Sequence, residues 1–241
     1  QLMRFFTPNI SSGFLPEYTL EADALSLALD GYLGFGGFEL FLDDVIVPRV
    51  FGGLFFLRPS VLAGSSDPWL KRLSLAVTVA SDVEAPFAET SKMTNGSVHG
   101  IGIDAEYKFY KGESLDIKSY LDGSGLLYTG GSGFGGALGV LVRGNIESTN
   151  THVLRARLEF RLSGASFIPS YFDTTYRLGR LAAPSDGGET ASGMTKLDLL
   201  RSLEKDPSRW GVYTELTYHL FRRFSIMASY EDAGSLGDAA Q

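Results

Sequence analysis

The stretch from His152 to Leu162, HVLRARLEFRL, alternates apolar and charged residues without a break. At about 100° per residue its charges would scatter around a helix, whereas at a period of two they share one side of a strand. The segment therefore predicts a β-strand with two opposite faces. The apolar face carries Leu154, Ala156, Leu158, Phe160 and Leu162, and the charged face carries Arg155, Arg157, Glu159 and Arg161.

The same alternation recurs along most of the chain, for example in residues 72–82, 101–110, 115–122 and 212–220. The first three predicted strands are the least defined, because apolar residues near 25–29 occur at both parities. In all, the pattern predicts ten strands, near 19–31, 34–47, 51–63, 70–84, 97–111, 113–124, 133–144, 151–180, 208–221 and 223–232.

Composition is consistent with one all-β domain over residues 1–241, since the chain holds 29 glycines and 12% aromatic residues. The net charge of -7 argues against a nucleic-acid-binding domain, which needs clustered Lys and Arg. The chain has no cysteine, which excludes disulfides and zinc–thiolate sites. Its apolar runs are far shorter than the roughly 18 residues of a transmembrane helix. We expect no cofactor and no metal ion.

The predicted connections differ in length. Residues 111–114 and 221–224 form tight turns, whereas 84–97 and 181–208 form long connections. If both tight turns lie at one end of the sheet, residues 151–180 must cross it once, which favours one long bent strand. A hairpin remains the alternative, because Pro169 removes a backbone donor from such a strand.

One short helix is predicted inside the long 181–208 connection. Thr195 and Asp198 have the spacing of a capping box, and the segment ends before Pro207. Leu197, Leu200 and Leu203 recur at helical intervals. We expect this helix to cover one end of the sheet or to pack on the connection.

The two faces of the strands fit either a soluble sandwich or a membrane barrel. The polar faces combine charges of both signs with Gly, Ser and Tyr, as an enclosed wet interior requires. Aromatic residues also gather near strand ends, where membrane barrels place aromatic girdles. They are Tyr107, Phe109 and Tyr110 at one tight turn and Tyr218, Phe221 and Phe224 at the other.

Taken together, these features resemble a bacterial outer-membrane β-barrel protein, over most of the chain and without a motif of one family. The resemblance implies an antiparallel up-and-down transmembrane barrel of about ten strands (range 8–14), located in the cell outer membrane with the lipid bilayer as its partner. Such barrels commonly end on a strand with a terminal aromatic residue, whereas this chain ends in GSLGDAAQ. The difference indicates either a chain incomplete at its C-terminus or another class of protein.

In such a barrel the polar strand faces would line the lumen, and the arginine-rich strand would be the selectivity element. The leading hypothesis is a narrow channel or uptake pore for small polar solutes. The alternatives are a non-conducting barrel that anchors or assembles other envelope proteins, and a barrel hydrolase that uses His219 with Glu215. The predicted lumen-lining residues are Arg155, Arg157, Glu159, Arg161, Asp104, Glu106, Lys108, Asp116, Lys118, Asp122, Glu215 and His219.

Overall fold

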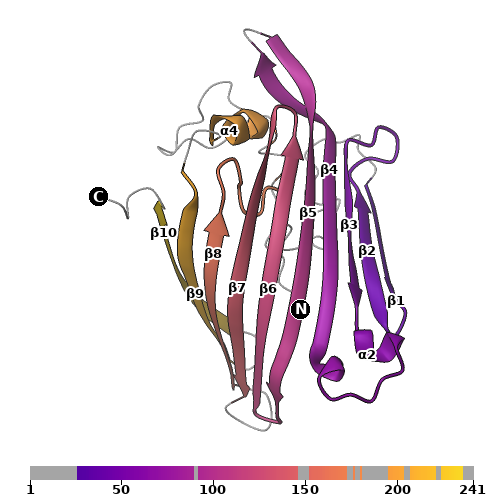
Figure 1. The fold of residues 1–241 in the computed structure, drawn as a ribbon, viewed down its shortest axis with the longest axis vertical. Coiled ribbons are helices and arrows are strands. Elements are labelled where there is room, and N and C mark those ends of the chain that lie inside the picture. The colour runs from indigo at the N-terminus through magenta and orange to yellow at the C-terminus, as the bar shows by residue number, and fades with distance from the viewer. Residues whose placement is uncertain are drawn as a thin grey trace.

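Ten antiparallel strands form one sheet, in which they follow the order of the sequence (Figure 1). The computed structural model describes residues 26–89, 92–145, 152–172, 176, 180, 195–203, 207–220 and 224–235. The predicted all-β, up-and-down antiparallel fold with about ten strands is confirmed. The strands are β1 Leu27–Tyr32, β2 Gly36–Leu42, β3 Val50–Leu57, β4 Leu73–Glu89, β5 Lys92–Lys111, β6 Leu115–Tyr128, β7 Gly131–Asn145, β8 His152–Ser163, β9 Arg209–Leu220 and β10 Phe224–Ser235.

The sheet curves around an interior, and each strand pairs only with its neighbours in sequence (Figure 1). Within the described residues, β1 and β10 each pair with a single strand. The β5–β6 turn lies at the lower end of Figure 1, where β9 also ends and β10 begins. The strand ends that the two predicted tight connections join therefore share one end, while residues 221–223 themselves lie outside the described residues. The two-residue turn of Thr129 and Gly130 lies at the upper end.

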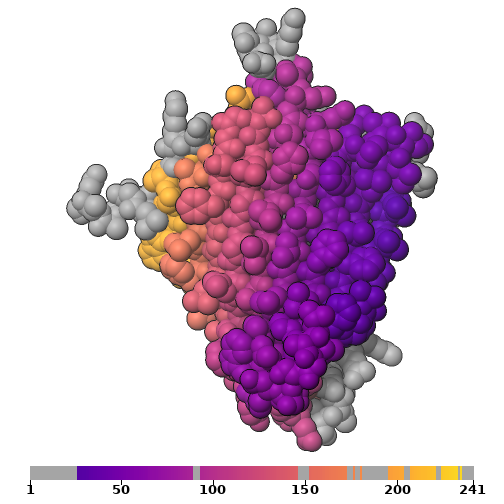
Figure 2. Space-filling model, turned by 45° about the vertical axis from the view of Figure 1, so that its right-hand side comes forward, coloured from indigo at the N-terminus to yellow at the C-terminus, as the bar shows by residue number. Residues whose placement is uncertain are grey.

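The outer face of the sheet is apolar, whereas its buried charged side chains lie on the inner face, which is the reverse of a water-soluble domain. Leu158 on the outer face is 56% exposed, whereas its neighbour Glu159 on the inner face is 1% exposed. The two predicted faces of HVLRARLEFRL are therefore real, and the apolar face points outward. Exposed apolar side chains continue across the outer face, at Val77, Val79, Ile101, Ile103, Leu121, Leu127, Phe134, Leu138, Val140, Leu154, Phe160, Leu162 and Leu216. Figure 2 shows one side of the molecule, on which β1 to β8 follow one another from indigo to orange.

The upper half of the interior is filled by part of the β8–β9 connection, which we call the inserted segment (described residues 164–172, 176, 180 and 195–203). Its aromatic residues Phe167, Tyr171, Phe172 and Tyr176 are buried in an apolar cluster, together with inward residues of β2 to β7 such as Leu54. An apolar plug of this kind removes water from the upper interior.

Glycines of β7 allow the inserted segment to come close. A Cβ atom at Gly133 would collide with the backbone of Ser166, and one at Gly135 would collide with the ring of Phe167. The glycine-rich run of residues 131–136 therefore packs against the inserted segment. Its Gly131, Gly133 and Gly136 have the spacing of a dinucleotide-binding loop, but such a loop leads into a helix, whereas these residues lie within β7.

A buried ionic contact fixes the inserted segment to β4. Asp82 is fully buried and accepts a hydrogen bond from the Tyr176 hydroxyl at 2.8 Å. Arg180 donates to the same carboxylate from Nε at 2.7 Å and also bonds the Glu84 carbonyl. Removal from water raises the pKa of Tyr176 and of Tyr171 above the usual tyrosine value, so both hydroxyls stay neutral.

The prediction of one long strand over residues 151–180 was wrong. β8 ends at Ser163, and the chain then turns inward through Ser166 and Ser170, which both have positive φ. Among the described residues of this region β8 is the only strand, and it crosses the sheet once, so they form no hairpin. A single crossing is what the shared end of the tight turns required. Burial of the aromatic side chains inside the sheet favours this path over a longer ladder.

The predicted long connection at 84–97 was also wrong, because β4 and β5 continue as a hairpin to Glu89 and Lys92. A register shift between Asp82 and Ala85 changes which side chains point inward, so that Ala85 and Phe87 become buried. Such a bulge is the ordinary way for a strand to reverse its faces. The sequence alternation stops at this point, which is why the segment did not look like a strand.

The predicted helix is confirmed as α4, Lys196–Ser202, with Thr195 and Asp198 forming the capping box. Asp198 also accepts a hydrogen bond from the backbone of Ala88, which holds α4 over the upper end of the sheet (Figure 1). Two short elements were not predicted, namely α2, Pro59–Leu62, and the 3₁₀ turn η2, Leu70–Arg72. No described helix is long and apolar enough to cross a membrane.

The N-terminal strands are shorter than predicted. The strand expected at 19–31 is β1, Leu27–Tyr32, and residues 19–25 of the prediction lie outside the described residues. The strand expected at 51–63 ends at Leu57, since Pro59 begins α2 and proline is favoured in the first turn of a helix.

Candidate functional site in the interior

The centre of the charged face of β8 is Glu159, whose carboxylate is buried and fully engaged. Its Oε2 atom accepts from the Tyr120 hydroxyl at 2.5 Å and from Arg157 Nε at 2.9 Å. Its Oε1 atom accepts from Arg161 Nε at 2.5 Å. Two cations and one hydroxyl therefore compensate one buried negative charge, as burial of a carboxylate requires.

A glycine between the strands lets Tyr120 reach this carboxylate. In the register, Tyr120 of β6 lies opposite Gly139 of β7, and Gly139 lies opposite Glu159 of β8. A Cβ atom at Gly139 would collide with the Tyr120 ring. The missing side chain leaves a path across β7 along which the ring lies.

Strand β9 contributes the second carboxylate of this network. Glu215 accepts hydrogen bonds from Tyr213 at 3.0 Å and from Thr217 at 3.2 Å. It also lies 3.9 Å from a nitrogen atom of Arg155 and of Arg157. The predicted pairing of the arginine face with Glu215 is therefore present.

The arginines of β8 also pack on an aromatic ring and reach β10. The guanidinium carbons of Arg157 and Arg161 lie 4.8 and 4.4 Å from the centre of the Tyr213 ring. Arg161 Nη1 lies 2.6 Å from Oε1 of Glu231, an acid that the sequence did not single out. Each of these two arginines is thus held from more than one side.

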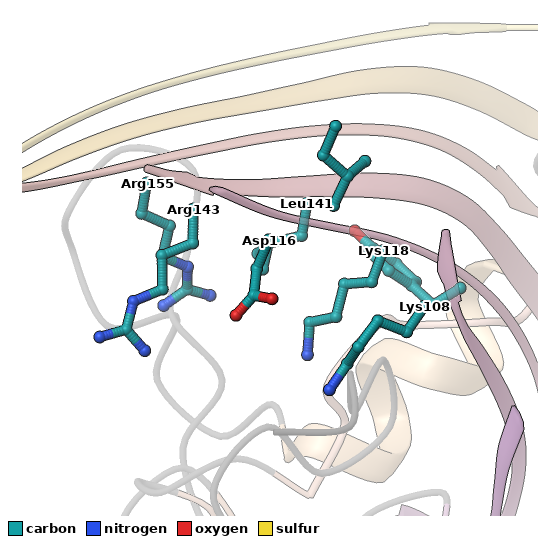
Figure 3. Close-up of a pocket in the computed structure, with 8 residues that line it drawn as sticks. Lys108, Asp116, Lys118, Leu141, Arg143 and Arg155 are labelled. Carbon is teal, nitrogen blue, oxygen red and sulfur yellow. The ribbon is translucent and has the colours of Figure 1, made fainter. Parts of the chain in front are cut away.

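A second group of charges lies toward the lower end, on β5 to β8. Lys108 lies opposite Lys118, and Asp116 lies opposite Arg143, which lies opposite Arg155. In Figure 3 the two lysine ammonium groups point the same way, and the Asp116 carboxylate lies between them and the two guanidinium groups.

Two adjoining cavities open onto these charges. The smaller has a volume of about 300 Å³ and is lined by Lys108, Asp116, Lys118, Arg143 and Arg155, together with Tyr120. The larger has a volume of about 910 Å³ and extends toward α2 and η2. Both share Lys108 and Lys118, so one solute could touch both.

The remaining predicted residues take separate positions. Glu106 forms an ion pair with Lys118 at 2.8 Å. Asp104 and Asp122 face each other across β5 and β6 and are both buried. Their level in the register is that of Arg161 on β8. Asp122 on β6 is two strand spacings from β8, about 9–10 Å, and Asp104 on β5 is three spacings away, about 14 Å.

The arrangement that a hydrolase would need is not present in the described residues. His219 lies on the inner face of β9 four residues beyond Glu215, but no hydrogen bond joins them. The Glu215 carboxylate is engaged by Tyr213, Thr217 and the arginines. The described residues also hold no cluster of three or more His, Asp or Glu that could bind a metal ion.

Several residues of the candidate site were missed by the sequence analysis. Tyr120 and Tyr213 occupy inward positions of the alternation but carry no charge, so only their partners reveal their role. Arg143 ends the apolar run of β7 at an inward position, which was an available signal. Asp82 was visible at the polar parity of β4, but its partners in the inserted segment were not.

Comparison with known proteins gives one structural likeness. No protein-family model matches the chain, and no curated protein matches it. A solved structure of an OmpT variant lacking loop L8, an outer membrane protein of Vibrio cholerae, is similar with a TM-score of 0.46 and 10% sequence identity. The similarity covers 90% of this chain and 61% of that chain, so the present chain spans about three fifths of its length.

Proposed function

We propose that the chain is an outer-membrane β-barrel that takes up small polar solutes through its interior. The observation that carries this proposal is the reversed polarity of the sheet, with apolar side chains outside and buried charges inside. In water such an outer face would be unfavourable. Each large apolar side chain left exposed forgoes the roughly 1.5–3 kcal/mol that its burial would contribute. In a bilayer the same face meets hydrocarbon.

The distribution of aromatic residues supports a position across a membrane. Trp69, Phe109, Tyr110 and Phe224 are all exposed and all lie at the lower end of the sheet. Aromatic side chains prefer the interface between hydrocarbon and headgroups, where their rings are partly buried. A belt of this kind is expected where strands leave the membrane.

The interior supports a role with polar solutes. Its lower half holds the two cavities and their charged lining, which suit a hydrated solute. Its upper half is filled by the inserted segment, which favours a path that opens only when this segment moves, rather than a permanently open pore. The function proposed is therefore selective uptake rather than general diffusion.

The inserted segment also favours a second candidate, a non-conducting barrel that anchors or assembles envelope proteins. A plug held by Asp82 and packed with buried aromatic residues would block flow as long as it stays in place. The upper connections would then carry the function.

Reconstitution separates the two candidates. The refolded chain is inserted into planar lipid bilayers, and single-channel currents are recorded in potassium chloride. Discrete, reproducible conductance steps support uptake, whereas insertion without conductance supports the anchoring role. A monomer that stays soluble in plain buffer without detergent would contradict both.

A further inference from the structure

We propose that the two cavities at the lower end form a binding site for a small solute that carries two or more phosphate or carboxylate groups. The inference deepens the proposed function by naming the class of solute. It does not require conduction, because binding at this site can be measured on the protein in detergent.

The charge around the cavities is strongly positive although the chain is acidic. The chain has a net charge of -7 and contains 21 Lys and Arg residues, of which eight line these two cavities beside two carboxylates. The cations come from several elements that are distant in sequence. They are Arg58, Lys71, Arg72, Lys108, Lys111, Lys118, Arg143 and Arg155.

The strand register places like charges directly opposite each other. Lys108 of β5 faces Lys118 of β6, and Arg143 of β7 faces Arg155 of β8. Like charges at opposed positions of neighbouring strands are destabilising. Glu106 pairs with Lys118, and Asp116 lies opposite Arg143, so part of the repulsion is already compensated. An anion bound between the two pairs would compensate the rest.

The acids of the site leave much of this charge uncompensated. Glu106 is engaged with Lys118, and one oxygen of Asp116 is buried without a hydrogen bond. Arg155 Nε also has no hydrogen-bond partner, and the nearest described carboxylate to it is that of Glu215 at 3.9 Å. Lys108 and Arg143 form no ion pair with any described residue.

The shape and the other lining groups suit a small oxyanion. Ser60, Ser65 and Ser74 add hydroxyl groups to the larger cavity, and hydroxyls donate to phosphate and carboxylate oxygens. Both cavities share Lys108 and Lys118, so anionic groups in the two cavities would be bridged by these lysines. Each cavity, at about 300 and about 910 Å³, lies within the range of volumes of sites for small molecules.

Inorganic pyrophosphate is the probe, titrated by calorimetry into the refolded full chain in a non-ionic maltoside detergent and phosphate-free buffer. We expect saturable binding that weakens with added salt. The variant Lys108→Gln, Lys111→Gln should bind about tenfold more weakly or not at all. The matched control is Arg49→Gln at the upper end, which removes one cation outside the site and should leave binding unchanged.

A second readout distinguishes binding cations from structural ones. If Lys108 serves a ligand rather than the fold, the Lys108→Gln variant without pyrophosphate should be at least as stable to urea as the wild type. Added pyrophosphate should then raise the stability of the variant less than that of the wild type. Absence of saturable binding, or equal weakening in Arg49→Gln, would overturn the proposal. Lower resistance to urea without the probe would also contradict it.

The source of the anionic group is decided by competition. Citrate, a soluble polycarboxylate, should displace pyrophosphate, whereas phosphatidylglycerol added to the micelles should not. Displacement by phosphatidylglycerol would assign the site to a lipid headgroup and overturn the proposal of a soluble ligand. Binding without conductance would leave this site intact and refute only the uptake role.

Discussion

Replacing Leu158 by arginine tests whether the outer face meets lipid. Leu158 is 56% exposed, lies on the outer face and stands in the middle of β8. In water, a charge at such an exposed position would change the free energy of unfolding by at most about 0.5 kcal/mol. In a bilayer the same charge must be placed in hydrocarbon.

The depth of Leu158 sets the expected magnitude. β8 runs from His152 to Ser163, so five or six residues of strand lie on either side. At about 3.4 Å per residue and a tilt of about 40°, each side spans roughly 13–16 Å along the membrane normal. Leu158 therefore lies near the centre of an apolar band of about 25 Å, where arginine costs about 2–4 kcal/mol.

Folding into phospholipid vesicles, followed by tryptophan fluorescence across a urea series, measures this difference. The matched control is Ser132→Arg, on the outer face but near the upper end of β7, where the cost should be about 0–1 kcal/mol. Similar values for Leu158→Arg and Ser132→Arg, both below about 0.5 kcal/mol, would refute a lipid-facing outer surface.

Three further outcomes are expected. Asp82→Asn removes the charge that holds the inserted segment at Tyr176, so single-channel conductance should rise; an unchanged current would mean that this contact does not limit flow. Gly139→Ala should displace the Tyr120 ring and lower the free energy of unfolding by about 1–3 kcal/mol in urea titrations. Adding Tyr120→Phe to this variant should change the free energy of unfolding little, because the hydrogen bond from the Tyr120 hydroxyl to Glu159 is already lost. Burial raises the pKa of Tyr171 and Tyr176, so the unfolded chain loses these protons first, and stability measured by thermal unfolding should fall as pH rises above about 10.

The strand pattern was predictable because a period of two is a local property of the sequence. Alternation in HVLRARLEFRL determines which side chains share a face, whatever lies beyond the strand. The inserted segment was not predictable in this way. Phe172 and Tyr176 have the parity of a continued strand, but their burial depends on contacts with β3 and β4, about 90 or more residues earlier. Local pattern cannot distinguish a longer strand from a segment that folds inward.

The candidate site was predictable as a charged face but not as a set of partners. The pairing of Arg157 with Glu215 follows from adjacent strands, where register places them opposite each other. Tyr120 reaches Glu159 over an intervening strand only because position 139 is glycine. Contacts that skip a strand depend on three residues at once, which a pattern in one strand cannot reveal.

Under the proposed uptake, the two halves of the interior would constrain transport separately. A solute entering from the lower end first meets uncompensated cations such as Lys108 and then the network around Glu159, where each charge has a partner. Beyond it lies apolar packing, in which an unpaired anion would cost several kcal/mol by loss of hydration. Passage therefore requires the inserted segment to leave Asp82, whereas selection of anions does not. Substitution of Lys108 should change the ratio of anion to cation permeability and leave the size of the conductance steps unchanged. Substitution of Asp82 should change the size of the conductance steps and leave this permeability ratio unchanged. A single substitution that altered both equally would show that one constriction performs both roles.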